Sequence, residues 1–181
     1  MPHSGSALID PKNIFDAINL TEGMRVADFG CGRTGHFIFL ASKMVGETGV
    51  VYAMDILKDV LASIASRSRS EGYHNIQTVW TNVEKVGATP IPEATLDGGF
   101  LVNTLFMMED KKQTLQEVSR LLKKDGWLVV VDWFKKIGPL GPEEGKMLKK
   151  DELLDMAGQN GLKSIQEFNC GEHHFCIIFK K

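Results

Sequence analysis

The first residues whose types and spacing could do chemistry form the hexapeptide GCGRTG, from Gly30 to Gly35, in a chain of 181 residues. Its G-x-G-x-x-G spacing is typical of dinucleotide-binding loops, because glycines permit a tight turn and let a ligand approach the backbone. Asp28, two residues before the loop, argues against that ligand, since its carboxylate would repel a pyrophosphate. It suits a ligand with a cationic amino group or a sulfonium, unless it only caps the loop or the helix that follows.

Two polar residues further along the chain extend this signal. Asp55 ends a second apolar run, and an acid there can accept hydrogen bonds from both ribose hydroxyls. Nicotinamide sites and other adenosine sites share that feature, and Asp55 could also cap a helix. Asn82 follows a third apolar run, where its amide could reach the amino group of adenine while the Val83 N–H reaches a ring nitrogen. An ordinary loop asparagine is an equally good interpretation of Asn82 alone.

Apolar periodicity predicts the elements that must position these residues. Seven short apolar runs predict strands at residues 24–29, 49–55, 75–80, 96–103, 127–133, 163–169 and 173–180. Helical spacing predicts helices that begin at Pro11 after an Asp10 cap, at residues 36–45, from Ile56 to about Ser70, at 115–122 with a stop near 124–126, and at 151–160 before Gly161. Residues 1–9 are expected to be a loose start.

The order of these elements predicts an α/β fold. Strands alternate with helices, which favours a parallel sheet covered on both faces, and the last two strands, joined by a tight turn at Gly171, place the final strand antiparallel. Ligands bind such sheets at the carboxyl ends of the strands. Polar residues fall at five of those ends, namely Asp28, Asp55, Asn82, Asn103 and Asp132.

Composition narrows the class of protein. A net charge of −2 and a pI near 6.2 give no electrostatic signature of nucleic-acid binding. Three cysteines without framework spacing argue against a secreted disulfide scaffold, and no apolar stretch approaches the length of a membrane span. The first ten residues lack a signal-peptide pattern, so the expected location is the cytoplasm.

Taken in order, the segments VADFGCG, VVYAMD, TNVEKV, LDGGFLVNTLF and EVSRLLKKDGWLVVVDW resemble a class I S-adenosylmethionine-dependent methyltransferase. The chain looks similar to small methyltransferases related to the quinone-biosynthesis C-methyltransferases and to the arsenite methyltransferases. The resemblance covers residues from about 10 to the end. It implies a Rossmann-like doubly wound sheet of strand order 3-2-1-4-5-7-6, and a single methyltransferase domain over residues 1–181.

The resemblance also implies roles for individual residues. Asp28 would contact the methionine amino group of S-adenosylmethionine, and Asp55 would hold the ribose diol. The other residues implied in binding the cofactor, and its product S-adenosylhomocysteine, are Gly30, Cys31, Gly32, Ile56, Asn82, Val83 and Asn103. The family's commoner loop is shorter, because Arg33-Thr34 places an extra residue before Gly35. We expect Arg33 to point to solvent, with the cofactor carboxylate as the alternative.

No side chain in the sequence stands out as a general base. His36 is expected to be a surface or loop-packing residue, and Cys31 is not expected to be a nucleophile. The pattern C-x-x-H-H-x-C at residues 170–176 suggests zinc, but strand alternation places His173 and His174 on opposite faces. We therefore predict no metal site, and arsenite chemistry is disfavoured because Cys31 lies far along the chain from the other cysteines.

The acceptor pocket is expected beyond the fourth and fifth strands. The nearest side chains along the sequence are Phe106, Met107, Met108, Trp133, Phe134 and Pro139. Their apolar character suits a flat or hydrophobic acceptor, although such residues as often fill a core. The expected acceptor is a small molecule. Either a large acceptor covers the site, or the N-terminal segment and the 135–147 loop close over it, or a partner subunit in a homodimer completes it.

Methyl transfer is the first hypothesis, and two others remain open. A non-enzymatic binding module could keep the fold, although such modules often lose the glycines or the ribose acid. A nicotinamide-dependent oxidoreductase would explain GCGRTG and Asp55, but it leaves Asp28 unexplained, and 181 residues leave little room for a catalytic domain.

Overall fold

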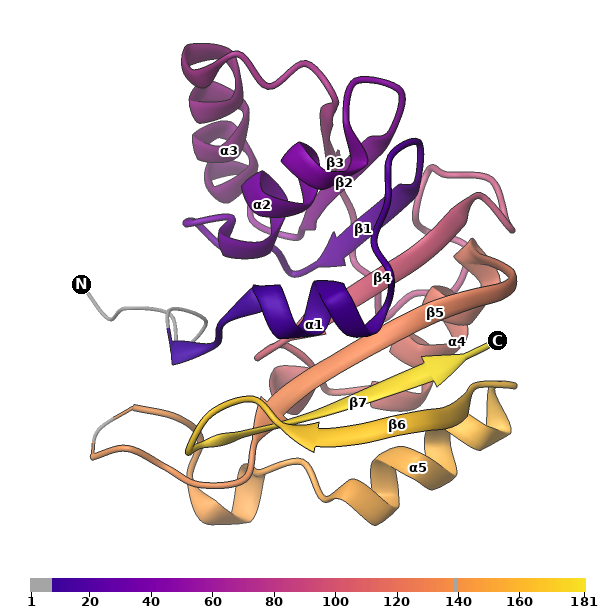
Figure 1. Cartoon of the computed structure of the whole chain (residues 1–181). Helices are drawn as coiled ribbons and strands as arrows, with labels where there is room; N and C mark the ends of the chain where they lie inside the picture. The colour runs from indigo at the N-terminus through magenta and orange to yellow at the C-terminus, as the bar shows by residue number, and fades with distance from the viewer. Residues whose placement is uncertain (1–7, 139) are drawn as a thin grey trace.

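A seven-stranded sheet runs through the middle of the molecule (Figure 1). The computed structural model describes residues 8–138 and 140–181. The strands are β1 (Arg25–Phe29), β2 (Val50–Asp55), β3 (Ile76–Trp80), β4 (Leu96–Val102), β5 (Leu122–Trp133), β6 (Lys163–Asn169) and β7 (His174–Lys180). Their order is β3-β2-β1-β4-β5-β7-β6, and β7 is antiparallel to both of its neighbours. The fold predicted from the sequence is therefore confirmed.

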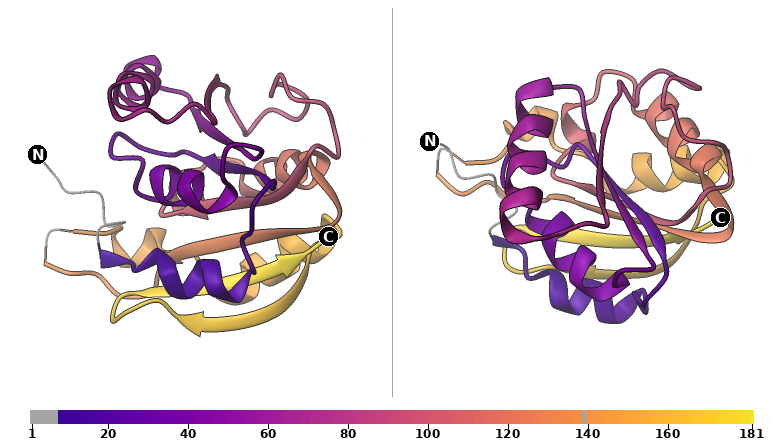
Figure 2. Two further views of the ribbon diagram at one scale, coloured as in Figure 1. Left: turned by 45° about the horizontal axis from the view of Figure 1, so that its top comes forward. Right: turned by 90° about the horizontal axis from the view of Figure 1, so that it is seen from above.

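Helices cover both faces of the sheet, in two layers that the view from above in Figure 2 shows on opposite sides. Helices α1 (Pro11–Ala17), α2 (His36–Val45) and α3 (Lys58–Glu71) pack on one face through a shared apolar cluster. Helices α4 (Lys111–Leu121) and α5 (Lys150–Gln159) pack on the other face through a second cluster. Two short 3-10 turns, η2 (Leu105–Met107) and η3 (Glu144–Lys146), lie in the connections.

Local sequence signals explain most element ends. Asp10 caps α1 by accepting a hydrogen bond from the Lys12 N–H at 3.0 Å, and Pro11 takes the first helical position, as expected. Gly161 and Gly171 adopt φ of +75° and +88° at the predicted stop and turn, which a glycine does without strain. None of the helices in the described part of the chain has the length and apolar character needed to cross a membrane.

The beginning of β5 differs from the prediction. The Leu-rich helix was expected to run to Leu122, with a strand from Trp127, but β5 already begins at Leu122. Leu122 pairs with Leu96 of β4, and the register then shifts before Gly98 pairs with Trp127. Asp125, at φ +63°, donates its N–H to the Lys181 carbonyl at 3.1 Å. The polar residues 123–126 are typical of a turn, but contacts with residues distant in the sequence keep them in the sheet.

The first residues are only partly described. Residues 1–7 of the expected loose start lie outside the described residues, as does Pro139 of the expected acceptor wall. Ile9 is 2% exposed and belongs to the cluster under α1 and α2. The core therefore begins before α1, so the expected loose start over residues 1–9 is wrong at Ile9.

Candidate functional site

The glycine loop turns sharply at the carboxyl end of β1. The N–H groups of Gly30 and Cys31 both donate to the Met54 carbonyl, at 2.9 and 3.0 Å, which ties the loop to the end of β2. Gly30 has φ +80°, and a Cβ there would come within 2.5 Å of Thr104 Cγ2. Glycine is required at this position both by conformation and by space.

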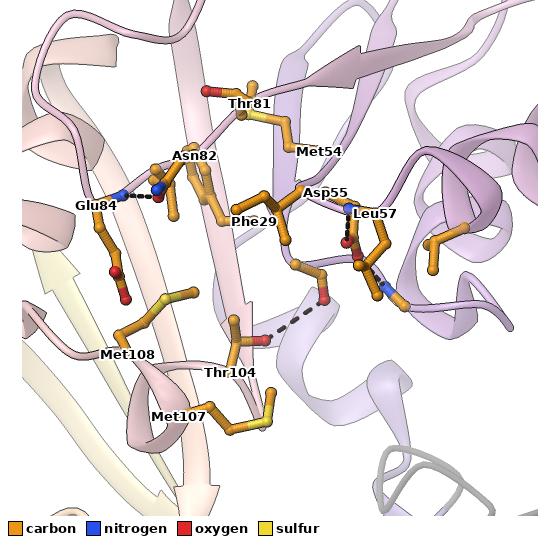
Figure 3. Close-up of a pocket in the computed structure, with 15 residues that line it drawn as sticks. Phe29, Met54, Asp55, Leu57, Thr81, Asn82, Glu84, Thr104, Met107 and Met108 are labelled. Carbon is orange, nitrogen blue, oxygen red and sulfur yellow. Dashed lines mark hydrogen bonds between the residues drawn. The ribbon is translucent and has the colours of Figure 1, made fainter.

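A cavity of 380 Å³ opens beside this loop, at the carboxyl edge of β1, β2 and β3 (Figure 3). In the close-up, Met107, Met108 and Thr104 lie opposite Asp55 and Leu57. The lining residues are Phe29, Gly30, Gly32, Met54, Asp55, Ile56, Leu57, Val60, Thr81, Asn82, Val83, Glu84, Thr104, Met107 and Met108. The cavity is mainly apolar, with Asp55 as the acid at the end of β2.

Asp55 is held by two backbone donors. One carboxylate oxygen accepts from the Leu57 N–H at 2.9 Å, and the other accepts from the Gly32 N–H at 3.3 Å. An ionised carboxylate offers about four lone-pair sites. Two therefore stay available in the cavity, which matches the two donors of a vicinal diol.

Two apolar side chains and one amide complete the cavity. Ile56 is 55% exposed at its rim, whereas Val83 is buried in its wall. The Asn82 Oδ1 accepts from the Glu84 N–H at 3.0 Å, so the local turn engages the amide oxygen. The Asn82 amide nitrogen makes no hydrogen bond within the described residues. Glu84 in turn accepts from the Glu109 N–H at 2.8 Å and links this wall to the chain beyond η2.

A second cavity of 140 Å³ continues on the α2 side of the loop. It is lined by Asp28, Gly30, Cys31, Gly32, His36, Phe37, Val102, Asn103, Thr104 and Met107. Four of these residues, Gly30, Gly32, Thr104 and Met107, also line the larger cavity. The two spaces are therefore adjacent and meet at the glycine loop.

Asp28 provides the acid of the smaller cavity. Its side chain comes from the central strand β1 and is 4% exposed. Burial first, and then repulsion from Asp55, raise the pKa of Asp28 to about 7. A cation bound beside it would favour its ionised form.

Asn103 contributes an amide with no partner. Its φ is +53°, so the chain turns away directly after β4. Both amide atoms are buried and make no hydrogen bond to any described residue. A buried amide in this state loses the free energy of its hydrogen bonds to water, which a bound polar ligand would restore.

Cys31 and Arg33, two of the three residues of the loop other than glycine, have different surroundings. Cys31 is 7% exposed in the smaller cavity, and burial together with the charges of Asp28 and Asp55 raises the pKa of its thiol. A protonated thiol is a poor nucleophile. Arg33 forms an ion pair with Asp59 and is 59% exposed. Arg33 thus points away from both cavities, as expected.

Asp132 does not reach either cavity, which corrects one of the five strand-end positions. It is fully buried and accepts from the Phe106 N–H at 3.1 Å and the Trp133 N–H at 2.8 Å. Burial raises the pKa of Asp132 to about 7. Since both oxygens bind backbone groups, this side chain holds η2 against the end of β5.

The expected acceptor wall is only partly brought together. Met107 and Met108 line the larger cavity, whereas Phe106 faces another groove, of 540 Å³, beside α5. Trp133 is buried and packs on His174 with ring centroids 4.0 Å apart. Phe134 is 42% exposed. Neither aromatic side chain lines either of the two adjacent cavities.

Several residues that line the two cavities were not predicted from the sequence. Thr104 and Glu84 directly follow residues that were singled out, but a loop threonine or glutamate carries no signal of its own. His36 was assigned to the surface or to loop packing, whereas it lines the smaller cavity. Within the described residues, no group of three or more His, Cys, Asp or Glu side chains could hold a metal ion.

Comparison with known proteins shows the class of protein to which this fold and candidate site belong. Residues 20–169 match a family model described as Methyltransferase domain. This chain belongs to that family, which confirms the resemblance noted in its sequence.

Individual relatives narrow the comparison. The chain is 32% identical over 123 residues to the ubiquinone/menaquinone biosynthesis C-methyltransferase UbiE of Escherichia coli, covering 67% of this chain and 47% of the relative. The chain thus spans about half the length of the curated relatives it matches. A solved SAM-dependent methyltransferase from Aquifex aeolicus is 26% identical, with a TM-score of 0.87, over 99% of this chain and 93% of that one. An arsenic(III) S-adenosylmethionine methyltransferase from Chlamydomonas reinhardtii shares the fold at 20% identity and a TM-score of 0.70, over 88% of this chain and 63% of that one.

Proposed function

We propose that this protein binds S-adenosylmethionine across the two adjacent cavities and transfers its methyl group to a small, apolar acceptor. The observation that carries the proposal is the placement of two acids, Asp55 and Asp28, in adjacent spaces on either side of one glycine loop. An adenosine with a diol needs the first acid, and a cationic amino-acid end needs the second. The family and the solved Aquifex relative support this assignment.

The residues present fit that cofactor. Ile56 and Val83 offer apolar surface to an adenine in the larger cavity, and the free Asn82 amide nitrogen lies in the same wall. The 140 Å³ cavity has a size suited to the amino-acid end of the cofactor. Asn103 offers that end an amide nitrogen as donor and an amide oxygen as acceptor, both without a partner among the described residues. Gly30, Cys31 and Gly32 are small, so a ligand can lie close to the loop backbone and extend from one cavity into the other.

S-adenosylmethionine supplies a methyl group bound to a positively charged sulfur, which is a good leaving group. The protein's own task is therefore mainly to position the two reactants, and positioning can lower a barrier by on the order of 7–11 kcal/mol. Asp55 fixes one end of the ligand and Asp28 the other. The four residues common to both cavities then surround the point between those ends, where the methyl group would lie.

The acceptor is proposed to approach past η2. Met107 is 63% exposed and lines both cavities, and Met108 lines the larger one, so flexible thioethers form the open side of the site. The E. coli relative is named as a quinone-biosynthesis C-methyltransferase, which favours a small molecule as acceptor. We further propose that residues 1–181 act as one methyltransferase domain. A homodimer and a cytoplasmic location stay predictions from the sequence.

A nicotinamide cofactor fits the site less well. Among the described residues, neither cavity lining contains a lysine or an arginine to balance a pyrophosphate. Asp28 instead brings a buried carboxyl group to the loop, where burial favours its neutral form and an anion would disfavour its ionisation further.

Calorimetry with S-adenosylhomocysteine, S-adenosylmethionine and NADH tests the cofactor. We expect micromolar-range binding of the first two and none of NADH; the reverse pattern would reject the proposal. A transfer assay with tritiated methyl groups against fractionated cell extract then tests the acceptor class. Label is expected in the small-molecule pool, and label confined to protein or RNA would contradict a small acceptor. Binding without transfer into any pool would favour the non-enzymatic module.

A further inference from the structure

The charge balance of the smaller cavity leaves one ligand group without a partner. This inference rests on the proposed function, because the amino-acid end of S-adenosylmethionine carries both an ammonium and a carboxylate. Asp28 can pair with the ammonium. The carboxylate would enter a space where Asp28 and, nearby, Asp55 are acids and where the described lining contains no lysine or arginine.

Arg33 is the nearest guanidinium along the chain, but its ion pair with Asp59 places it on the outside of the loop. Arg67 is also engaged elsewhere, since it donates to Glu71 and to the Thr34 carbonyl. Of the residues that line either cavity, His36 is therefore the one whose side chain can carry a positive charge.

The position of His36 suits that task. It is the first residue of α2, directly after the loop, and its ring lines the smaller cavity together with Asp28 and Asn103. The Nε2 atom lies 3.1 Å from the Ile9 carbonyl oxygen. A carbonyl only accepts hydrogen bonds, so Nε2 carries a hydrogen and donates it. The Nδ1 atom makes no hydrogen bond to any described residue, so it is available to a ligand.

We propose that His36 binds the carboxylate of the cofactor's amino-acid end through Nδ1, with a proton on both ring nitrogens. The positive ring then lies between two acceptors, the Ile9 carbonyl and the ligand carboxylate, an arrangement that favours the charged form. Asp28, Cys31 and Asn103 line the smaller cavity together with His36, and Lys43, Arg67 and Glu71 line a second groove that His36 also borders. Asp28 has its pKa raised to about 7 and gives up a proton when an ammonium binds beside it.

This pairing makes His36 a residue that recognises one end of the ligand. The segment that contains Ile9 becomes part of the same recognition, because its carbonyl fixes the ring and its side chain is anchored in the core. Loss of the His36 charge should lower the affinity for ligands that carry the carboxylate and leave the affinity for ligands without it unchanged.

The test compares S-adenosylhomocysteine with 5′-methylthioadenosine, which keeps the adenosine but lacks the amino-acid end. Calorimetry on the full chain would use the wild type, His36→Gln and His36→Ala. Glutamine can still donate to the Ile9 carbonyl but carries no charge. His74→Gln is the matched control, because His74 lies in an exposed groove near the far ends of α2 and α3.

We expect His36→Gln to weaken the binding of S-adenosylhomocysteine by about tenfold to a hundredfold, which corresponds to the loss of a charge-assisted hydrogen bond. Its affinity for 5′-methylthioadenosine should stay within about twofold of the wild type. That retained affinity also shows that the variant is folded. His74→Gln should leave both affinities unchanged. Equal weakening of the two ligands, or of neither, would overturn the role of His36.

Nitrogen NMR of the histidine rings gives a second readout. With saturating S-adenosylhomocysteine, both nitrogens of His36 should carry a proton, whereas a persistently bare Nδ1 would contradict the proposal. A wild type that binds 5′-methylthioadenosine but binds S-adenosylhomocysteine no better would reject both contacts to the amino-acid end, that of His36 and that of Asp28, and would leave the adenosine site in place. A wild type that binds neither ligand would reject the proposed function and this assignment with it.

Discussion

At the scale of single residues, the two acids of the site lie in different environments. Asp55 binds two backbone N–H groups at the cavity edge, whereas Asp28 is buried and has its pKa raised to about 7. A buried carboxyl group of this kind is costly to ionise, and a bound cation reduces that cost. Asp28 is thus poised to take up its charge together with the ligand.

Asp28→Asn should therefore remove both affinity and pH dependence. Below pH 7 the wild type must release a proton from Asp28 to bind a cation, so its advantage over the variant should shrink about tenfold per pH unit down from 7. Above pH 7 the advantage should level off. Calorimetric titration of both proteins with S-adenosylhomocysteine from pH 5.5 to 8 measures this ratio. The ratio isolates Asp28, because the other titrating groups are common to both proteins; a constant ratio would contradict the role of Asp28.

Gly30→Ala should abolish cofactor binding while the rest of the sheet stays folded. The new Cβ would lie 2.5 Å from Thr104 Cγ2 at a φ of +80°, so either the loop or Thr104 must move into the ligand's path. We expect binding of S-adenosylhomocysteine to fall by at least about a hundredfold, since steric overlap in a tight loop costs a few kcal/mol. Gly72→Ala is the control, because Gly72 has φ +75° with open space around it at the end of α3. Equal binding by both variants would reject the steric argument.

At the scale of elements, the buried carboxylate of Glu117 joins α4 to the loop that follows β3. Glu117 accepts from the Gly87 N–H at 2.7 Å and the Thr89 N–H at 3.1 Å, and it pairs with Arg120. Although burial opposes ionisation, these donors hold the pKa of Glu117 at about 2. The loop that contains these donors follows Asn82 and Glu84, so Glu117 supports one wall of the larger cavity.

Glu117→Gln should lower the free energy of unfolding by about 2 kcal/mol, because the amide replaces an acceptor with a donor that faces N–H groups. The pKa of Glu117 is depressed in the folded state, so its contribution is present above the unfolded value of about 4.5. It should be lost as the pH falls from 4.5 toward 2. Urea unfolding of wild type and variant at pH 7 and pH 3 measures both effects. Glu152→Gln, which breaks an exposed pair with Lys149, should change stability by less than about 0.5 kcal/mol.

At the scale of the whole molecule, His174 is a buried group that resists protonation. It is fully buried against Trp133, neither ring nitrogen has a partner among the described residues, and burial followed by the charge of His173 lowers its pKa to about 4. The unfolded chain binds a proton at this residue near pH 6.5, whereas the folded chain does not. The contribution of His174 should therefore lower the free energy of unfolding as the pH drops from 6.5 to 4.

His174→Phe should remove that part of the acid sensitivity. The wild type should lose about 2–3 kcal/mol more than the variant between pH 7 and pH 4, because lowering a pKa from 6.5 to about 4 corresponds to about 3 kcal/mol. Asp28 and Asp132 act in the opposite direction over this range, since burial raises their pKa values to about 7. Chemical unfolding at several pH values gives the difference between the two proteins, in which the acids cancel. Parallel stability curves for wild type and variant would reject this role of His174.

Much of the site was predictable because its residues lie at the ends of apolar strands. Asp28, Asp55 and Asn103 follow runs whose burial is visible in the sequence, and parallel strands bring such ends to one edge. Asp132 shows the limit of the same rule. It also ends an apolar strand, but η2 packs over it and takes both of its oxygens. Position along a strand does not reveal which neighbour will cover a side chain.

The sequence by itself determined the order of strands and helices, the glycine turn and the acids at its edges, because hydrophobic period, capping and glycine conformation act over a few residues. Tertiary structure decided the partners of each side chain. It turned Arg33 out to Asp59, began β5 at Leu122 through pairing with Leu96, and placed His36 in the smaller cavity with its ring held by Ile9. Those contacts join residues far apart in the chain, so their geometry exists only once the sheet and its two helix layers are assembled.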